Sequence, residues 1–141
     1  MFLGEFEYKI DGKGRVPLPP RFRRELREGV ILTQGVEKCI VAYSLSEWGK
    51  LATTLTAGPI TSSKLRRLNR ALFASAFNII MDGQGRIALP LPLRQYAGIE
   101  NEVIIVGANN YFELWNKDQW QSEKAISQEQ AWQIMESLET H

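Results

Sequence analysis

A five-residue turn that combines acidic, glycine and arginine side chains occurs twice in the chain. The copies read Asp11-Gly12-Lys13-Gly14-Arg15 and Asp82-Gly83-Gln84-Gly85-Arg86, and the second follows the first at a fixed offset of 71 residues. Glycine exposes backbone N–H groups that can approach a phosphate, and the planar guanidinium of arginine fits phosphate oxygens or guanine edges. A long repeat used only twice does not build a solenoid. We therefore expect two similar sites related by a pseudo-two-fold axis.

The aspartates and glycines of these turns have a simpler interpretation than ligand contact. Glycine and aspartate adopt the backbone conformations of tight turns at low cost. We assign this turn-building role to Asp11, Gly12, Gly14, Asp82, Gly83 and Gly85. Arg15 and Arg86 keep two interpretations, since each can pair with the aspartate of its own turn or face nucleic acid. We favour the nucleic-acid role for Arg15 and give it less weight for Arg86.

Basic side chains gather in and after the first turn. They are Lys9, Lys13, Arg15, Arg21, Arg23, Arg24 and Arg27, offset only by Asp11, Glu25 and Glu28. This excess favours phosphate contact by some of them over an ordinary solvated helix face. The second copy is depleted, with Gln84, Pro92 and Gln95 at the positions of Lys13, Arg21 and Arg24. The first repeat should therefore supply most of the attraction to DNA.

The remaining composition argues against an enzyme, a metalloprotein or a membrane protein. The only histidine is His141 and the only cysteine is Cys39, so we expect no histidine-based catalytic site, no structural zinc, no cofactor and no internal disulfide. No apolar run is long enough to cross a membrane. The lack of a disulfide favours a reducing, cytoplasmic location.

The net charge of +1 hides an uneven distribution. Residues 1–81 contain 13 Lys/Arg against 7 Asp/Glu, whereas residues 82–141 contain 4 against 9. This asymmetry suggests a basic face for a polyanion, or basic and acidic surfaces that meet between subunits.

Periodicity and turn residues predict an α+β chain, mainly β. Each repeat is expected to hold a hairpin around its turn, a short helix that starts near a proline, a second strand pair and a helix that carries Trp48 or Trp120. We place the first unit at 5–50, a connecting helix at 57–76, the second unit at 77–122 and a C-terminal helix at 125–141. Each half is near the lower size limit for its own core, so the halves either share a core or complete it through other subunits.

The duplicated turn, each copy followed by a strand that ends in proline and a short helix, resembles the MraZ family. The start Met1-Phe2-Leu3-Gly4, the segment Leu93–Gly98 and the run Phe112–Trp115 also look like that family. The resemblance implies two fused AbrB-like units that form a swapped-hairpin, double-psi-like barrel with peripheral helices. It also maps the family's signature arginines onto Arg15 and Arg86, and its signature aspartates onto Asp11 and Asp82.

The same resemblance implies a function. MraZ proteins are bacterial, cytoplasmic, nucleoid-associated transcription regulators. They form rings of eight or twelve subunits and bind short direct repeats in double-stranded DNA upstream of the division and cell-wall gene cluster, which they usually repress.

We therefore expect a sequence-specific DNA-binding repressor that acts as an oligomeric ring. One subunit neutralises few phosphates, so several copies must engage DNA together. The alternative is a structural or protein-interaction ring without specific DNA readout, in which the turns bind protein partners. A third hypothesis, an enzyme with a phosphate-binding turn, predicts saturable nucleotide binding.

Overall fold

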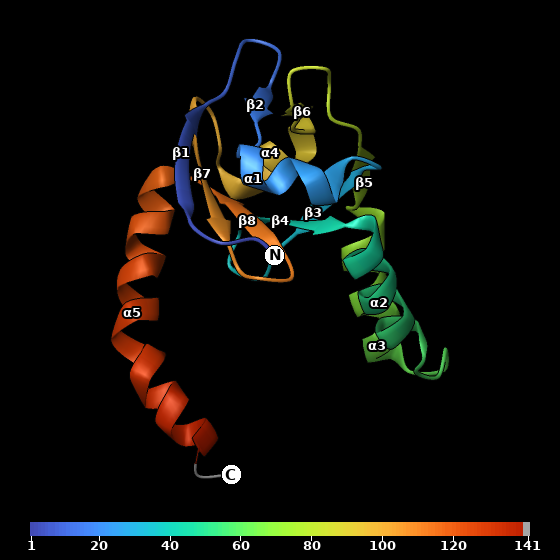
Figure 1. Ribbon diagram of the computed structural model, residues 1–141. Helices are drawn as coiled ribbons and strands as arrows, with labels where there is room; N and C mark the ends of the chain where they lie inside the picture. The colour runs from blue at the N-terminus through green and yellow to red at the C-terminus, as the bar shows by residue number, and fades with distance from the viewer. Residues whose placement is uncertain (140–141) are drawn as a thin grey trace.

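The computed structural model describes residues 1–139 and places the two turns side by side at one end of the molecule (Figure 1). A sheet forms from strands in the order β1 (Glu5–Lys9), β7 (Glu102–Gly107), β8 (Phe112–Trp115), β4 (Ile40–Ser44), β3 (Val30–Gln34) and β5 (Phe77–Ile79). A separate ribbon pairs β2 (Arg15–Pro17) with β6 (Arg86–Ala88). The ribbon carries the two turns, and the sheet supports it.

Strands are exchanged between the repeats. β1 of the first repeat pairs with β7 of the second, while β5 of the second pairs with β3 of the first. The expected hairpin of β1 with β2 is therefore wrong beyond the turn itself. Pro17 has no backbone N–H, so β2 lacks one hydrogen-bond donor for a neighbouring strand. In addition, Val16 and Leu18 are fully buried in a core that residues of the other repeat complete.

One hydrophobic core contains residues of both repeats, which fits the first of the two alternatives that the chain length left open. Phe22 of the first repeat packs against Phe112 of the second, with ring centroids 5.2 Å apart, and Phe2 lies 5.0 Å from each. All three rings are at most 1% exposed. Neither half would retain this cluster on its own.

Two short helical segments cover the core beneath the ribbon. The first is α1 (Pro20–Arg23) followed by the 3-10 turn η1 (Arg24–Leu26), and the second is α4 (Leu91–Ala97). Both start just after a proline, whose fixed φ suits a first helical turn, and α4 ends at Gly98 as expected. Each therefore follows its ribbon strand directly and stays close to the turns.

Two longer helices extend away from the sheet on the side opposite α5 (Figure 1). They are α2 (Leu45–Thr56) and α3 (Ser63–Ala74), whose first turns are capped by the hydroxyls of Ser44 and Ser62. Such a cap satisfies a backbone N–H that has no partner within the helix. α3 is shorter than the connecting helix expected at 57–76.

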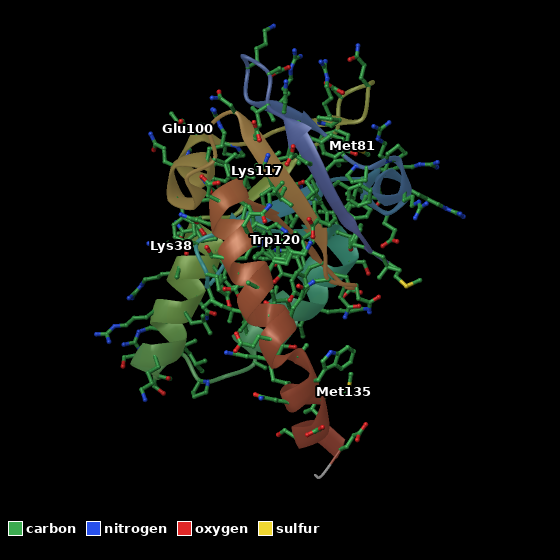
Figure 2. The ribbon with its side chains drawn as sticks, turned by 90° about the vertical axis from the view of Figure 1, so that its left-hand side faces the viewer. Lys38, Met81, Glu100, Lys117, Trp120 and Met135 are labelled. Carbon is green, nitrogen blue, oxygen red and sulfur yellow. The ribbon has the colours of Figure 1, made fainter. Side chains whose placement is uncertain are left out.

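The last helix, α5 (Lys117–Glu139), is continuous, so the helix that carries Trp120 and the separate C-terminal helix expected from 125 are one element. Its first turns dock on the sheet through Trp120, which lies 5.6 Å from Trp115, and through Lys117 (Figure 2). The Lys117 ammonium pairs with Glu7 of β1 at 3.2 Å and Glu102 of β7 at 3.3 Å. The expected end of this helix at 140–141 lies outside the described residues.

The structure confirms the α+β class. Within residues 1–139 the ladders form two open sheets, and the swapped-hairpin, double-psi type of barrel stays a prediction. In the same residues, no helix combines the length and apolarity needed to cross a membrane.

Candidate nucleic-acid interface

The β2–β6 ribbon has one buried face and one open face. Val16 lies opposite Ile87 in the antiparallel register, and both side chains are fully buried. Because side chains alternate along a strand, Arg15 and Arg86 project from the other face. The exchange of strands thus places two arginines from distant parts of the sequence on one open surface.

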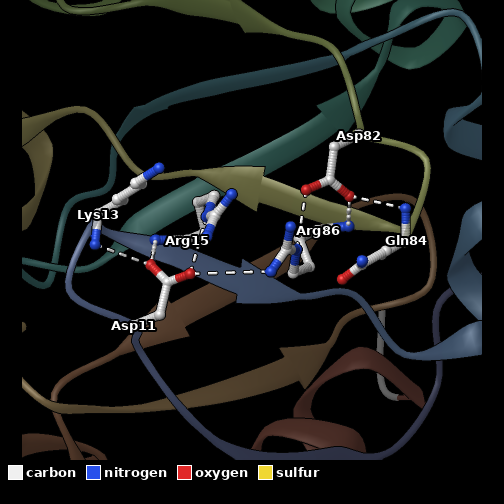
Figure 3. A network of polar contacts seen from close by, with 6 residues as sticks. All are labelled: Asp11, Lys13, Arg15, Asp82, Gln84 and Arg86. Carbon is white, nitrogen blue, oxygen red and sulfur yellow. Dashed lines mark hydrogen bonds and ion pairs between the residues drawn. The ribbon is translucent and has the colours of Figure 1, made fainter.

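The carboxylate of Asp11 organises the first turn (Figure 3). Its Oδ1 accepts the backbone N–H groups of Lys13 and Arg15, each at 2.9 Å, and its Oδ2 accepts Nε of Arg15 at 2.7 Å. These bonds, foremost the one from the backbone of Arg15, lower the pKa of Asp11 from 3.8 to about 2. The Asp11 carboxylate therefore bridges the backbone on both sides of Gly14.

The second turn repeats this geometry with little change. Asp82 accepts the backbone N–H groups of Gln84 and Arg86 at 2.9 Å and Nε of Arg86 at 2.8 Å. The pKa of Asp82 is lowered as well, mainly by the backbone bond from Arg86. The turns are also linked, because Nη1 of Arg86 lies 3.9 Å from Oδ2 of Asp11 (Figure 3).

Both interpretations of the turn arginines are compatible with this arrangement. Each arginine pairs with its own aspartate, but through Nε, while 32% of the Arg15 side chain and 27% of the Arg86 side chain stay exposed. Within residues 1–139 the Nη groups of Arg15 donate no hydrogen bond, so they are available to an acceptor outside the protein. The aspartate thus orients a guanidinium whose outer edge remains open to a phosphate or a base.

The structure divides the basic cluster of the first repeat. Lys13 is exposed in the turn and Lys9 is exposed at the adjoining end of β1. Arg21 and Arg24 are exposed on the helical segment below, where Arg24 and Arg27 line a surface pocket beside Ser44. Lys9, Lys13 and Arg15 are therefore the basic side chains grouped at the first turn.

Arg23 differs from the others and has a partner that sequence reasoning missed. Its Nε donates to the carbonyl of Leu18 at 3.0 Å, and Arg94 makes the same bond to Leu89. The two arginines are themselves 71 residues apart, so the repeat offset was the signal that could have identified them. Unlike most of the cluster, this arginine is retained in both repeats.

A group of possible metal ligands lies elsewhere, where the turn between β3 and β4 meets β8. One ligand atom each from Glu37, Cys39 and Glu113 lie within 4.8 Å of one another. Burial raises the pKa of the Cys39 thiol well above its usual range, and the thiol donates weakly to Glu113 at 3.8 Å. A protonated, buried thiol is a poor nucleophile.

Known proteins resemble this chain over its full length. A family model described as "MraZ protein, putative antitoxin-like" matches it twice, over residues 1–71 and 72–139. A protein from Dehalococcoides mccartyi strain BAV1, named Transcriptional regulator MraZ, is 60% identical over 142 residues, covering 100% of both chains. A relative of the same name from Dehalococcoides mccartyi strain 195 is 59% identical over 99% of each chain. A third, from Roseiflexus sp. strain RS-1, is 44% identical over 86% of this chain and 85% of its own. With both halves matched by the family model and full-length relatives at this identity, the chain belongs to the MraZ family.

Proposed function

We propose that this protein is a sequence-specific DNA-binding transcription regulator, and that the open face of the β2–β6 ribbon contacts DNA. The observation that carries the proposal is the pair of arginines on that face, each oriented by an aspartate and partly exposed. The major groove of DNA admits a two-stranded ribbon, and arginine is the commonest reader of guanine there. The names of the relatives support the regulatory role.

The two turns are expected to contribute unequally to binding. Lys13 adds a positive charge to the first turn, whereas the second turn has the neutral Gln84 at the same position. Phosphate contacts supply most of the salt-dependent affinity. Lys9, Lys13 and Arg15 are therefore proposed as the main DNA contacts, with Arg86 as a weaker one and the exposed Arg21 and Arg24 as flanking candidates. Arg23, a further candidate from the sequence, bonds to the carbonyl of Leu18 and is not proposed as a direct contact.

Several copies acting together would give the selectivity that one copy lacks. A bidentate arginine–guanine contact contributes about 1–3 kcal/mol of discrimination, which is too little to select one promoter in a genome. Linked copies raise avidity by about 10² to 10⁴ when their spacing matches that of the DNA sites. We propose a homo-oligomeric ring of eight or twelve subunits that binds direct repeats, because neighbours in a ring present their sites in one direction.

The single chain offers surface for such an assembly. The C-terminal part of α5 exposes large apolar side chains, among them Trp132 at 72% and Leu138 at 68%. Exposed apolar surface of this kind usually marks an interaction site. We propose that the ring is built from AbrB-like barrel units. We further propose that it lies in the cytoplasm, associated with the nucleoid, and represses the division and cell-wall gene cluster.

The test is a titration of the full-length protein with duplex DNA from the region upstream of that cluster, at several salt concentrations, against a scrambled duplex of equal length. The proposal expects tighter binding to the native duplex and a linear fall of log affinity with log salt. Equal affinity for both duplexes at every salt concentration would reject sequence-specific readout.

The arrangement of copies has its own test. Moving neighbouring repeats apart by half a helical turn should weaken binding strongly, because one repeat then faces away from the ring. Affinity that is indifferent to spacing would exclude simultaneous binding by neighbours. The competing structural ring predicts that added salt dissolves the oligomer before it affects DNA binding, which gel filtration at matched salt would reveal.

A further inference from the structure

The second glycine of each turn lies against an arginine from the opposite repeat. Gly14 and Gly85 have φ values of +76° and +75°, which disfavour any side chain. A Cβ at Gly14 would lie 3.1 Å from Cζ of Arg94, and a Cβ at Gly85 would lie 2.5 Å from Cζ of Arg23. The glycine is thus required both by its backbone conformation and by the guanidinium packed beside it.

The same arginine is fixed to a backbone segment that also holds the turn. The carbonyl of Gly14 accepts the N–H of Leu89 at 2.9 Å, and the carbonyl of Leu89 accepts Nε of Arg94 at 3.0 Å. At the second turn, the carbonyl of Gly85 accepts the N–H of Leu18 at 2.9 Å, and the carbonyl of Leu18 accepts Nε of Arg23 at 3.0 Å. Each turn therefore rests on one peptide and one guanidinium of the other repeat.

We propose that Arg94 and Arg23 are positioning residues that set the turns across the repeat boundary. Arg94 holds the first turn, with Arg15, and Arg23 holds the second turn, with Arg86. This inference rests on the proposed DNA contact of the turns. It follows that DNA reading by Arg15 depends on a side chain from the second half of the chain.

The guanidinium is suited to this role because it is flat and its Nε bond fixes its plane. A lysine at the same position keeps the charge but has no Nε donor and no planar face to pack on the glycine. If Arg94 acted only as a phosphate contact, lysine would largely replace it. A positioning role instead predicts that Arg94→Lys behaves like Arg94→Ala.

The test is a double-mutant cycle with the full-length protein and the upstream duplex, using Arg94→Ala, Arg15→Ala, Arg86→Ala and their combinations. Arg94→Ala alone should weaken binding roughly 5- to 150-fold, as if one arginine contact were lost. In the Arg15→Ala background it should add less than about twofold, because the contact it positions is already absent. In the Arg86→Ala background, Arg94→Ala should lower DNA affinity by the same factor as it does in the parent protein, because Arg86 lies in the other turn.

A global loss of stability would affect both turns, so coupling of Arg94 to Arg15 and to Arg86 alike would overturn the proposal. Full additivity with Arg15 would overturn it as well. Arg23→Ala is the matched reverse case and should couple to Arg86 rather than to Arg15. If Arg15→Ala leaves DNA binding intact, the proposed DNA contact of Arg15 is wrong. A failure of the proposed function is then distinguished from a failure of the positioning role of Arg94.

A measurement without DNA keeps the inference testable if Arg94→Ala folds poorly. In Arg94→Lys, the amide of Leu89, which bonds to Gly14, should exchange its hydrogen faster than in the parent protein. The amide of Leu18, which bonds to Gly85, should keep its rate. Equal changes at both amides, or none at Leu89, would refute a directed contact between Arg94 and the first turn.

Discussion

Replacing Arg15 by alanine removes the guanidinium that we assign to DNA contact and is expected to cost little stability. The Arg15–Asp11 pair is about one-third exposed on each side and joins only Nε to Oδ2. Ion pairs in such positions contribute little to stability because solvent screens them and both side chains lose conformational freedom. The variant should therefore fold and assemble as the parent does.

Its DNA affinity should change much more. The loss of a base contact is worth about 1–3 kcal/mol per engaged subunit, or roughly 5- to 150-fold in affinity. The loss of a phosphate contact instead lowers the magnitude of the salt slope by about 0.9. Fluorescence anisotropy with native and scrambled duplexes at several salt concentrations measures both quantities.

Three control variants sharpen this experiment. Arg67→Ala removes one exposed positive charge from α3, and it should have a smaller effect. Arg15→Lys keeps the charge but not the planar fork, so it should lose discrimination between duplexes more than it loses salt dependence. Arg86→Ala should weaken binding less than Arg15→Ala. If Arg15→Ala binds native DNA within about twofold of the parent at every salt concentration, Arg15 is not a reader.

Three further experiments test the turns and the core. Lys13→Gln gives the first turn the residue of the second and should lower the magnitude of the salt slope by about one, whereas Gln84→Lys should raise it; unchanged slopes in both would remove Lys13 from the interface. The lowered pKa of Asp11 predicts a stability contribution that is complete above about pH 4 and is lost as the pH falls through about 2. The difference in stability between the parent protein and Asp11→Asn should therefore disappear between these two pH values. An NMR titration that places the pKa of the Asp11 carboxyl near 3.8 would contradict this prediction. Phe22→Ala should cost about 3–5 kcal/mol in chemical denaturation, in a single transition because its ring also packs on Phe112 of the other repeat; separate transitions for the two halves would argue against a shared core.

Local chemistry determined a large part of this protein. The glycines and aspartates of the two turns, the prolines that start the short helices, and the serine caps act over a few residues, so their effects can be predicted from neighbours in the chain. The apolar runs at 30–33 and 103–106 predict strands in the same way, and the structure has β3 and β7 there. The fixed offset between the two turns also indicates the pseudo-symmetry, because similar sequences form similar local elements.

The partners of those strands were decided only by the tertiary structure. Whether β2 pairs with β1 or with β6 depends on where Val16 and Ile87 are buried, and that burial involves residues 71 positions apart. Turn sequence alone favoured a local hairpin. The exchanged pairing prevails because it buries the inner face of the ribbon in the core that both repeats share.

The roles of individual arginines were decided at the same level. In the sequence Arg23 is one of seven similar cations, and Arg94 stands outside the cluster. Only the exchange of strands brings each beside the glycine of the opposite turn. A charge pattern along a chain indicates that a polyanion can be attracted, but which cation faces outward and which supports a turn depends on packing between distant segments.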